Sequence, residues 1–413
     1  MRVLLVADGR SPTTLRWLNS LLQIGYQVRM ISSYPCDRPA GLDGFEVIPL
    51  AFSQIAGSAG QARSGNKPNA SARLLRQFVG QFRPAFLAGR YILGPISVQR
   101  RSRAFVQSVE KDPPDLVHAL RIPFEGMLAS TTPGNLPLIV SIWGNDLTLH
   151  SKGSPWMKRM TEVCLTRAQG LISDTHRDIR LGHLSGFPPD RPTLMVPGSG
   201  GINLAEINQA RSHTTGILSN YLPAGVPLIV NPRGSRPGSL RNDVFFRAIP
   251  LVLRQQPDAI FFCPAMAGNA EAVRWITWLK IKKQVRLMPM LPQSQLWDLF
   301  QHAQVYVSPG QHDGTPNSFL EAMACGCFPI VGDIESLREW ITSGENGLLI
   351  DPANPEALAN AILLALDSPK LRYQAKEINM ELIKQRAEVG LVRQEIDQFY
   401  RAVVGNYEVP AMA

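Results

Sequence analysis

The sequence predicts an α/β protein of two Rossmann-like domains, each with a doubly wound parallel sheet. Short apolar runs rich in β-branched residues alternate with longer helical patterns along the whole chain of 413 residues. Strands that are buried on both faces and separated by helices are typical of parallel sheets built from βαβ units. The runs form two successive sets, and a chain of this length exceeds what one ordinary core holds, so two domains are expected.

The candidate strands follow one another in order along the two sets. In the first set they are residues 3–7, 27–32, 46–50, 115–119, 138–142, 170–173 and 193–196. In the second set they are residues 227–231, 260–263, 285–288, 305–308, 328–331 and 348–351. The segments between them have helical patterns, which is the arrangement that a doubly wound fold needs.

The boundary between the domains is expected near the glycine-rich turn 197–201, because glycine permits a positive φ and a hinge. We therefore predict an N-terminal domain over residues 1–203 and a C-terminal domain over residues 204–385. The remaining tail, about 386–413, is predicted to be a helix. It has no strand to pair with and is expected to pack back on the first domain.

Composition excludes several classes of protein. No apolar run reaches the roughly 18–20 residues that a membrane-spanning helix needs. Five cysteines lie at 36, 164, 263, 325 and 327, without the paired spacing of a zinc site or a disulfide framework. They are best interpreted as reduced cysteines of a cytoplasmic protein.

The net charge of +9 is unevenly placed along the chain. No acidic residue stands between Glu46 and Glu110, whereas nine cations lie there, interleaved with apolar residues, over 63–103. Such a stretch suits an anionic membrane surface or an anionic acceptor. Nucleic acid is not expected as a partner, because no recognised nucleic-acid motif accompanies the charge. The alternative is a solvated helical face followed by a loop.

Residues 308–326 predict a strand end, a loop and a helix in succession. The loop contains the turn Asp313-Gly-Thr-Pro, Asn317 or Ser318 can cap the helix, and Gly326 can end it. The start of this helix is expected at the carboxyl edge of a parallel sheet, where open α/β sheets bind ligands. Its N–H groups and the helix dipole suit a diphosphate.

Two acidic residues flank this predicted diphosphate site. Glu321 lies one turn inside the helix, where a carboxylate can accept hydrogen bonds from two vicinal ribose hydroxyls. Asp313, eight residues earlier, can reach the sugar beyond the phosphates. Taken alone, each acid has a structural interpretation, as a helix-dipole partner and a turn residue; together they predict a grip on a nucleotide sugar. The rest of the predicted donor site is Thr315, Pro316, Asn317, Ser318 and Phe319.

This segment resembles the signature of the GT-B glycosyltransferases of family 4. That signature has two glutamates separated by seven residues, followed by Ala-Met-Ala-x-Gly. Glu321 matches the second glutamate, and Asp313 stands at the first acidic position, where the usual residue is glutamate. A version with Asp-Gly-Thr-Pro-Asn-Ser also occurs in that family.

The resemblance extends over nearly the whole chain. Residues 115–119 resemble the family's strand that ends in a histidine, and residues 141–147 resemble the segment that lines the acceptor side of the cleft. Residues 196–203 resemble the interdomain turn, and residues 343–352 resemble the closing strand of the donor domain. The resemblance implies the GT-B fold: two facing Rossmann-like domains, an N-terminal acceptor domain and a C-terminal donor domain.

Breaking a sugar–phosphate bond builds negative charge on the departing diphosphate, which cations must stabilise. The sequence has no Asp-x-Asp dyad for a metal ion, so arginines after the first strand of the second set are expected to do this. The resemblance places an arginine and then a lysine there. Arg233 matches the arginine, and Arg236 or Arg241 replaces the lysine. An arginine offers a two-pronged contact to phosphate oxygens.

The first domain offers fewer candidates. Gly9 follows the first strand, where the resemblance implies a glycine that approaches the diphosphate or the acceptor. His118 and Asp146 are candidates for the acceptor side, and His118 is assigned a catalytic role beside Arg233, Arg241 and Asp313. A structural role for His118 is the alternative.

These observations predict a metal-independent glycosyltransferase that moves a sugar from a nucleoside diphosphate sugar to an acceptor hydroxyl, and the resemblance implies that the transfer is retaining. The expected acceptor is a glycan or a lipid-linked molecule of glycan, polysaccharide or glycolipid synthesis, and no cofactor is expected beside the donor. The expected location is the cytoplasm, with peripheral contact at the inner membrane face through 63–103. The alternatives are a sugar-nucleotide epimerase of related fold and a non-catalytic sugar-nucleotide-binding protein.

Overall fold

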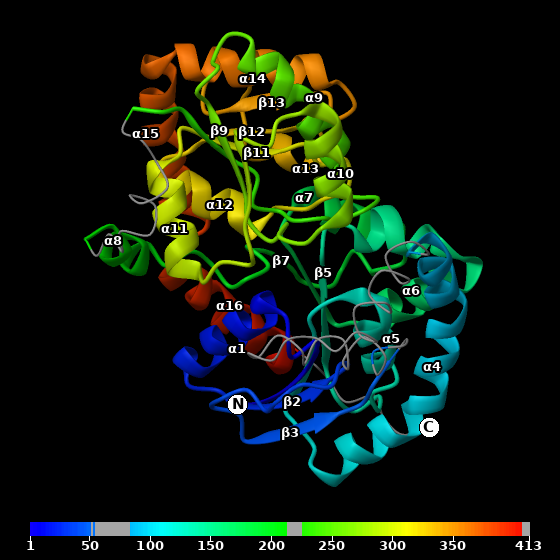
Figure 1. Ribbon diagram of the computed structural model, residues 1–413. Coiled ribbons are helices and arrows are strands. Elements are labelled where there is room, and N and C mark those ends of the chain that lie inside the picture. Colours follow the sequence, from blue (N-terminus) through cyan, green and yellow to red (C-terminus); the bar gives the residue numbers. More distant parts are fainter. Residues whose placement is uncertain (51–52, 54–82, 213–224, 407–413) are drawn as a thin grey trace. The chain divides into compact units, whose positions relative to one another are not determined.

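The computed structural model describes residues 1–50, 53, 83–212 and 225–406 (Figure 1). The contacts divide the chain into two compact units. The first unit comprises Met1–Gly200 and Arg393–Ala413, and the second comprises Gly201–Val392. The chain thus passes from one unit to the other twice.

The first unit contains a seven-stranded sheet in the order β3-β2-β1-β4-β5-β6-β7. All neighbouring strands in it are parallel. The strands are β1 Arg2–Ala7, β2 Gln27–Ser32, β3 Gly44–Val47, β4 Leu116–Ala119, β5 Leu138–Ile142, β6 Gly170–Ser173 and β7 Thr193–Met195. The helices with α geometry are α1 Pro12–Ile24, α4 Arg83–Lys111, α5 Met127–Ala129, α6 Pro155–Arg167, α7 His176–Leu184 and most of α16 Val389–Gly405.

Helix α16 packs on the first unit through a buried group of aromatic residues. The hydroxyl of Tyr400 accepts a hydrogen bond from Trp17 at 3.1 Å and bonds to His118. The ring of Tyr26 stacks on that of Tyr400, and its hydroxyl donates to Asp397. The end of the chain is therefore part of the first unit's core, although it lies far from it in sequence.

The second unit contains a six-stranded parallel sheet in the order β10-β9-β8-β11-β12-β13. Its strands are β8 Leu228–Val230, β9 Ile260–Cys263, β10 Val285–Leu287, β11 Val305–Ser308, β12 Phe328–Gly332 and β13 Leu348–Ile350. Its helices are α8 Leu204–Ser212, α9 Asn242–Leu253, α10 Ala270–Leu279, α11 Gln293–His302, α12 Asn317–Cys325, α13 Glu335–Arg338, α14 Pro355–Asp367 and α15 Pro369–Arg386.

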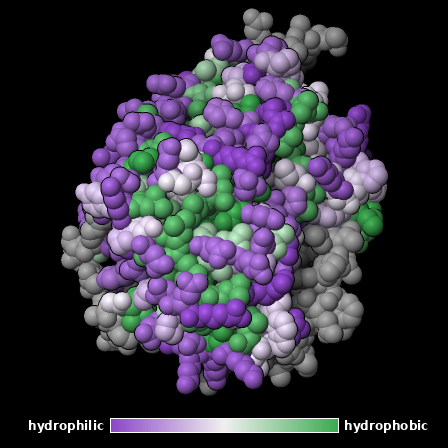
Figure 2. Space-filling model, turned by 90° about the horizontal axis from the view of Figure 1, so that it is seen from above, coloured by the Kyte–Doolittle hydropathy of each residue, from purple (hydrophilic) through white to green (hydrophobic). Residues whose placement is uncertain are grey.

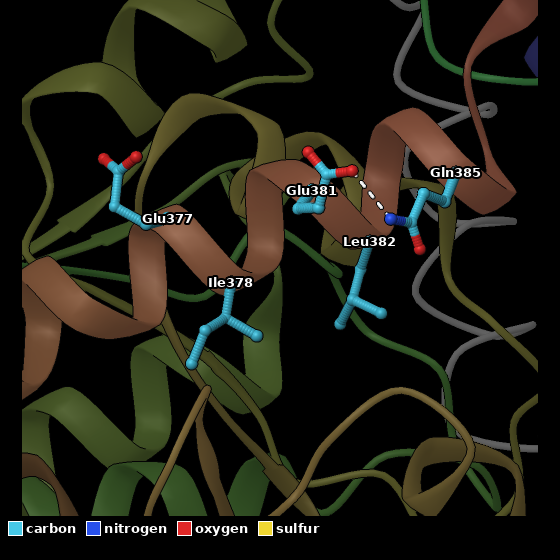
Figure 3. Close-up of a pocket in the computed structure, with 5 residues that line it drawn as sticks. All are labelled: Glu377, Ile378, Glu381, Leu382 and Gln385. Carbon is cyan, nitrogen blue, oxygen red and sulfur yellow. Dashed lines mark hydrogen bonds between the residues drawn. The ribbon is translucent and has the colours of Figure 1, made fainter.

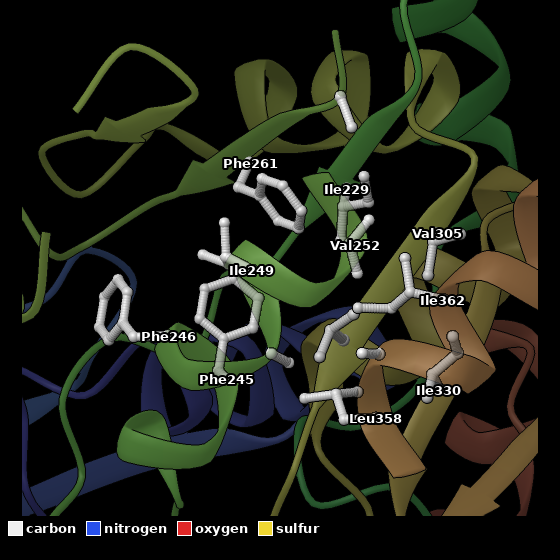
Figure 4. Packing of buried hydrophobic residues seen from close by; sticks show 14 of the residues in the cluster. Ile229, Phe245, Phe246, Ile249, Val252, Phe261, Val305, Ile330, Leu358 and Ile362 are labelled. Carbon is white, nitrogen blue, oxygen red and sulfur yellow. The ribbon is translucent and has the colours of Figure 1, made fainter. Parts of the chain in front are cut away.

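Two hydrophobic clusters belong to this second sheet. In one, Phe245 and Ile249 of α9 meet Leu358 of α14 over the strands (Figure 4). In the other, Phe300 of α11 and Phe319 of α12 are buried with Leu228, Tyr306 and their neighbours. Because both faces are covered, the strands are continuous apolar runs, as expected for a parallel sheet.

The sequence predicted every one of these strands, with shifts of a few residues at their ends. The largest shift is at β3, predicted at 46–50 and found at Gly44–Val47. Past the end of this strand the amides of Ile48 and Leu50 still donate to the carbonyls of Ser32 and Ser33, at 2.9 and 3.2 Å, so the backbone contact with β2 continues there. The two doubly wound parallel sheets of the predicted fold class are confirmed.

In both sheets the strand order reverses between the first and the fourth strand. These positions are β1/β4 in the first unit and β8/β11 in the second. Ligands of open α/β sheets bind outside the carboxyl ends of the strands at such a reversal. A donor site is therefore expected at the loops that follow β8 and β11.

Candidate functional site

The loops after β8 and β11 are joined by backbone hydrogen bonds. Leu240 and Gly310 form an antiparallel bridge, and the amide of Arg241 donates to the carbonyl of Pro309 at 3.0 Å. Gly332 lies so close that a Cβ on it would meet the Gly310 carbonyl oxygen at 2.0 Å. Hydrogen bonds therefore hold together the two loops that carry the predicted site residues.

Arg233 and Asp313 meet in this place. Arg233 follows β8, Asp313 follows β11, and the guanidinium Nη2 donates to the carboxylate Oδ2. Their side chains are 7% and 19% exposed, respectively. The Ser336 hydroxyl holds the Asp313 backbone by donating to its carbonyl at 2.8 Å. The structure thus brings together the arginine and the first acid that the sequence singled out.

Arg236 adds a second positive charge beside this pair. Its Nε donates to the carbonyl of Arg233 at 3.3 Å, and its side chain is exposed. The positive charge of Arg233 is the largest cause of a shift that lowers the pKa of Arg236 to about 10, while Asp313 opposes that shift. Two cations share one carboxylate here, so the arrangement favours binding of a further anion.

Arg241 has a different partner. Its guanidinium makes a two-pronged ion pair with Asp243, with hydrogen bonds of 2.8 and 2.7 Å, at the start of α9. The bonds from Arg241 lower the pKa of Asp243. Between the two arginines proposed to replace the family's lysine, this geometry favours Arg236.

Helix α12 begins at Asn317 and ends at Cys325, with Gly326 at a φ of 92° as predicted. The predicted cap at Asn317 or Ser318 is wrong: Pro316 occupies the N-cap position and makes no side-chain cap hydrogen bond. The Ser318 hydroxyl lies 3.3 Å from that of the buried Tyr306, and Phe319 is fully buried. Proline, with its φ near −65°, can precede a helix without a polar cap.

Thr315 and Glu321 are both buried near this helix start. The Thr315 hydroxyl accepts a hydrogen bond from the indole of Trp340 at 3.0 Å. Glu321 is 2% exposed, and its Oε1 accepts a hydrogen bond from Gln293 at 3.0 Å. Gln293 is the first residue of α11, which the sequence analysis did not connect with Glu321. A buried carboxylate of this kind needs polar partners.

In the first unit, Gly9 lies directly after β1. Its amide donates to the Ser32 hydroxyl at 3.1 Å. A Cβ at this position would lie 2.7 Å from the sulfur of Cys36, so the close packing requires glycine. Gly9 was predicted to approach the diphosphate or the acceptor, and this bond to Ser32 occupies its N–H group.

His118 is fully buried in β4. Its Nδ1 bonds to the Tyr400 hydroxyl at 2.5 Å and its Nε2 to the Ser141 hydroxyl at 2.8 Å. Burial lowers the pKa of His118 to about 3. With both ring nitrogens bonded inside the core, this geometry favours the structural alternative over the predicted catalytic role.

Asp146, predicted as an acceptor-side candidate, lies in an ion pair at the carboxyl edge of the first sheet, and the sequence analysis missed its partner Arg121. Arg121 follows β4 and donates to Asp146 at 3.0 Å; Asp146 also accepts from the amides of Ile122 and Trp143. Nearby, Ser33 donates to the buried carboxylate of Glu125, whose pKa is raised, mainly by burial. The signal in the sequence was a charged residue, Arg121, two positions after a buried strand.

Three further observations bear on the earlier predictions. A hollow of about 390 Å³ beside α15 is lined by Glu377, Ile378, Glu381, Leu382 and Gln385, none of them a predicted site residue (Figure 3). Within the described ranges, no helix combines the length and the apolar character needed to span a bilayer. Of the basic stretch 63–103, residues 63–82 lie outside the described residues, and residues 83–103 belong to α4.

Two family models match the chain. The one described as glycosyl transferases group 1 matches residues 241–381, and the one described as glycosyl transferase 4-like matches residues 2–175. The chain belongs to the GT-B glycosyltransferases of the group 1, or family 4, type. The residues matched by the group 1 model include Asp313 and Glu321, whereas Arg233 and Arg236 precede them.

Curated relatives of the family 4 chain match parts of it. A D-inositol 3-phosphate glycosyltransferase of Thermomonospora curvata is 27% identical over 224 residues, which cover 50% of each protein. An N,N'-diacetylbacillosaminyl-diphospho-undecaprenol α-1,3-N-acetylgalactosaminyltransferase of Campylobacter jejuni is 30% identical over 115 residues, 28% of this chain and 30% of the relative. The chain spans about half the length, or less, of these relatives.

Solved structures confirm the GT-B fold of the family 4 chain. Anabaena HepE in complex with UDP aligns with a TM-score of 0.68 and 13% identity, over 97% of this chain and all of that one. Sucrose-phosphate synthase from Thermosynechococcus elongatus aligns with a TM-score of 0.70 and 16% identity, over 98% of this chain and all of that one. At such identities the likeness concerns the fold.

Proposed function

We propose that the protein is a glycosyltransferase that moves a sugar, with retention and without a metal ion, from a nucleoside diphosphate sugar to an acceptor hydroxyl. The observation that carries the proposal is the meeting of Arg233, Arg236 and Asp313 after β8 and β11, at the reversal of the strand order. Solved relatives of the same fold include complexes with UDP and with UDP-glucose, which supports this class of donor.

In this proposal the two guanidinium groups contact the diphosphate of the donor. They stabilise the charge that develops as the sugar–phosphate bond breaks. Because both groups are in place before the reaction, they need no rearrangement while that charge forms. Asp313 orients Arg233 in the free protein and contacts the sugar in the complex. Glu321 holds the ribose, and the amides at the start of α12 approach the phosphates. The acceptor is a glycan or lipid-linked hydroxyl, recognised by the first unit.

We also keep the predicted contact of 63–103 with anionic membranes, at the cytoplasmic face, as part of the proposal. Its exposed apolar residues within the described part are Ile92 and Leu93, and Arg100, Arg101 and Arg103 follow them on α4. Apolar side chains next to cations suit a bilayer interface with anionic lipid.

A thermal-shift screen with UDP- and GDP-sugars, followed by product analysis, tests the donor proposal. We expect one nucleotide series to raise the unfolding temperature, and Glu321→Ala to abolish that rise and sugar transfer while leaving the far-UV spectrum unchanged. The product should keep the donor's anomeric configuration, and EDTA should leave the rate unchanged. Conversion of the donor sugar without any acceptor would identify an epimerase, and full activity of Glu321→Ala would refute the donor site.

A further inference from the structure

Exposed hydrophobic side chains are common on this molecule: Figure 2 shows them scattered among hydrophilic ones, gathering near the middle of one face. Such exposure is ordinary in itself. On α10 and in the turn after it, as on α4, exposed hydrophobic residues stand within a run of cations. Trp278 is 70% exposed and Val273 is 48% exposed.

We propose that this part of the second unit docks on an anionic phospholipid surface. The docking surface, here called the α10 surface, consists of Val273, Arg274, Trp278, Lys280, Lys282 and Lys283. The proposal goes beyond sugar transfer and does not depend on it. It also concerns a different segment from 63–103.

The α10 surface is held by the core beneath it. Ile276 of α10 is buried, and the partly buried Trp275 packs against the same hydrophobic cluster. The rings of Trp275 and Trp278 contact each other edge to face, with centroids 5.4 Å apart. Trp278 is therefore supported on a rigid base while most of its ring faces solvent, which is the arrangement of an interfacial anchor.

The cations lie close to this tryptophan. Arg274 precedes Trp278 by four residues and so shares its face of the helix. Lys280 follows at the end of α10 in the left-handed conformation, with a φ of 57°, where glycine is the usual residue. Lys282 and Lys283 are exposed in the turn that follows. A cation thus stands at a position that would sterically favour glycine.

The charge is unopposed along this segment of the sequence. Between Glu271 and Asp298 there is no acidic residue, and the same segment contains Arg274, Lys280, Lys282, Lys283 and Arg286. Anionic lipid surfaces attract such segments, and tryptophan favours the interface between headgroups and acyl chains. A second copy of the chain is a poorer occupant, because a twofold contact would bring the same cations together. Charge complementarity therefore favours anionic lipid.

Vesicle flotation with the full chain tests the proposal. The vesicles are phosphatidylcholine alone or an equimolar mixture with phosphatidylglycerol. We expect binding to the mixture only, and a loss on the order of a hundredfold in the variant Lys280→Gln, Lys282→Gln, Lys283→Gln, at about fivefold per lysine. The matched control, Lys370→Gln, Lys376→Gln, Lys384→Gln on α15, removes the same charge and should bind within about twofold of wild type. Equal losses in both variants would show a net-charge effect, and undiminished binding of the α10 variant would assign the lipid contact to 63–103; either result would overturn the proposal.

A second measurement reports on Trp278 itself. Brominated phosphatidylcholine mixed with phosphatidylglycerol should quench part of the protein's fluorescence, and Trp278→Phe should remove that quenched part. The control Tyr373→Ala, at another exposed aromatic residue of the same unit, should leave it unchanged. Quenching that persists in Trp278→Phe would overturn the proposal, as would binding of a single-stranded oligonucleotide in place of vesicles.

Discussion

At the scale of single residues, the charges after β8 and β11 do not balance. Arg233 and Arg236 stand beside the single carboxylate of Asp313, and the repulsion appears as the lowered pKa of Arg236. A diphosphate would compensate the excess charge. Arg241 lacks this property because Asp243 already neutralises it through a two-pronged pair.

This difference predicts how two conservative changes affect UDP binding. Arg236→Gln removes a charge that faces the anion, and we expect the affinity for UDP to fall about 10- to 150-fold, the range of a lost charged hydrogen bond. Arg241→Gln should change it by about twofold or less, as for a surface pair. Isothermal titration calorimetry on both variants measures this. A larger loss for Arg241→Gln would assign the phosphate contact to Arg241.

His118 belongs to the same scale but concerns stability. The unfolded chain binds a proton at this residue near pH 6.5, whereas the folded one does so only near pH 3. Between these values the unfolded state binds more protons, so the unfolding free energy falls as pH falls, by at most about 1.4 kcal/mol per pH unit. The contribution is fully present above about pH 6.5.

We therefore expect His118→Gln to be less stable than wild type at pH 7 but to lose less stability between pH 7 and pH 4.5. Urea unfolding followed by fluorescence at the two pH values measures both slopes. Residual dependence is expected from His150, whose pKa burial lowers to about 3. Equal slopes in the two proteins would mean that His118 is not buried in its neutral form.

At the scale of elements, β12 controls the position of the loop that carries Asp313. Gly332 ends this strand against the backbone of Gly310. In Gly332→Ala the new methyl group must push the loop away, at about 1–3 kcal/mol. We expect UDP affinity to fall about 5- to 150-fold, measured by calorimetry, without loss of the parallel sheet. Gly134→Ala, where no atom lies within 4 Å of the new Cβ, is the control. Unchanged affinity in Gly332→Ala would show that the loop position does not matter.

At the scale of the whole molecule, the chain returns to the first unit after completing the second. Residues from Arg393 onward belong to the first unit, where Tyr400 and Phe399 are buried. A chain that ends at Val392 lacks these side chains and leaves the polar atoms of His118 and Trp17 without their Tyr400 partner. Such losses are costly in a core.

We expect this truncated protein to keep the second unit and to loosen the first. Hydrogen–deuterium exchange should show faster exchange in β1 and β4 and unchanged protection in β8, β11 and β12. A double change in the last residues, Glu408→Gln with Met412→Ala, serves as the control because it keeps α16. Unchanged protection in β1 and β4 of the truncated protein would show that the first unit is complete without α16.

Most features that depend on residues near in sequence were predicted, whereas most features that depend on contacts between distant residues were not. Strands and the end of α12 at Gly326 depend on local apolar patterns and on glycine's access to positive φ, so the sequence predicted them. The predicted N-cap of α12, at Asn317 or Ser318, was wrong, because Pro316 takes the place that a polar residue usually has. The position of Arg236 beside Asp313 depends on residues distant in sequence, and so does the burial of His118.

The sequence alone determined the class of the fold, the family signature around Asp313 and Glu321, and the excess of arginine after β8. These are local properties, because apolar periodicity, turn residues and the spacing of charged residues depend only on residues that are close in the sequence. Only the tertiary structure decided which charges pair, which histidine is enclosed and which side chains of α16 fill the core of the first unit; the packing of that helix on the first domain was already predicted. Partners such as Arg233 and Asp313, 80 residues apart, meet because two parallel strands end at the same sheet edge. That proximity is a property of the folded backbone.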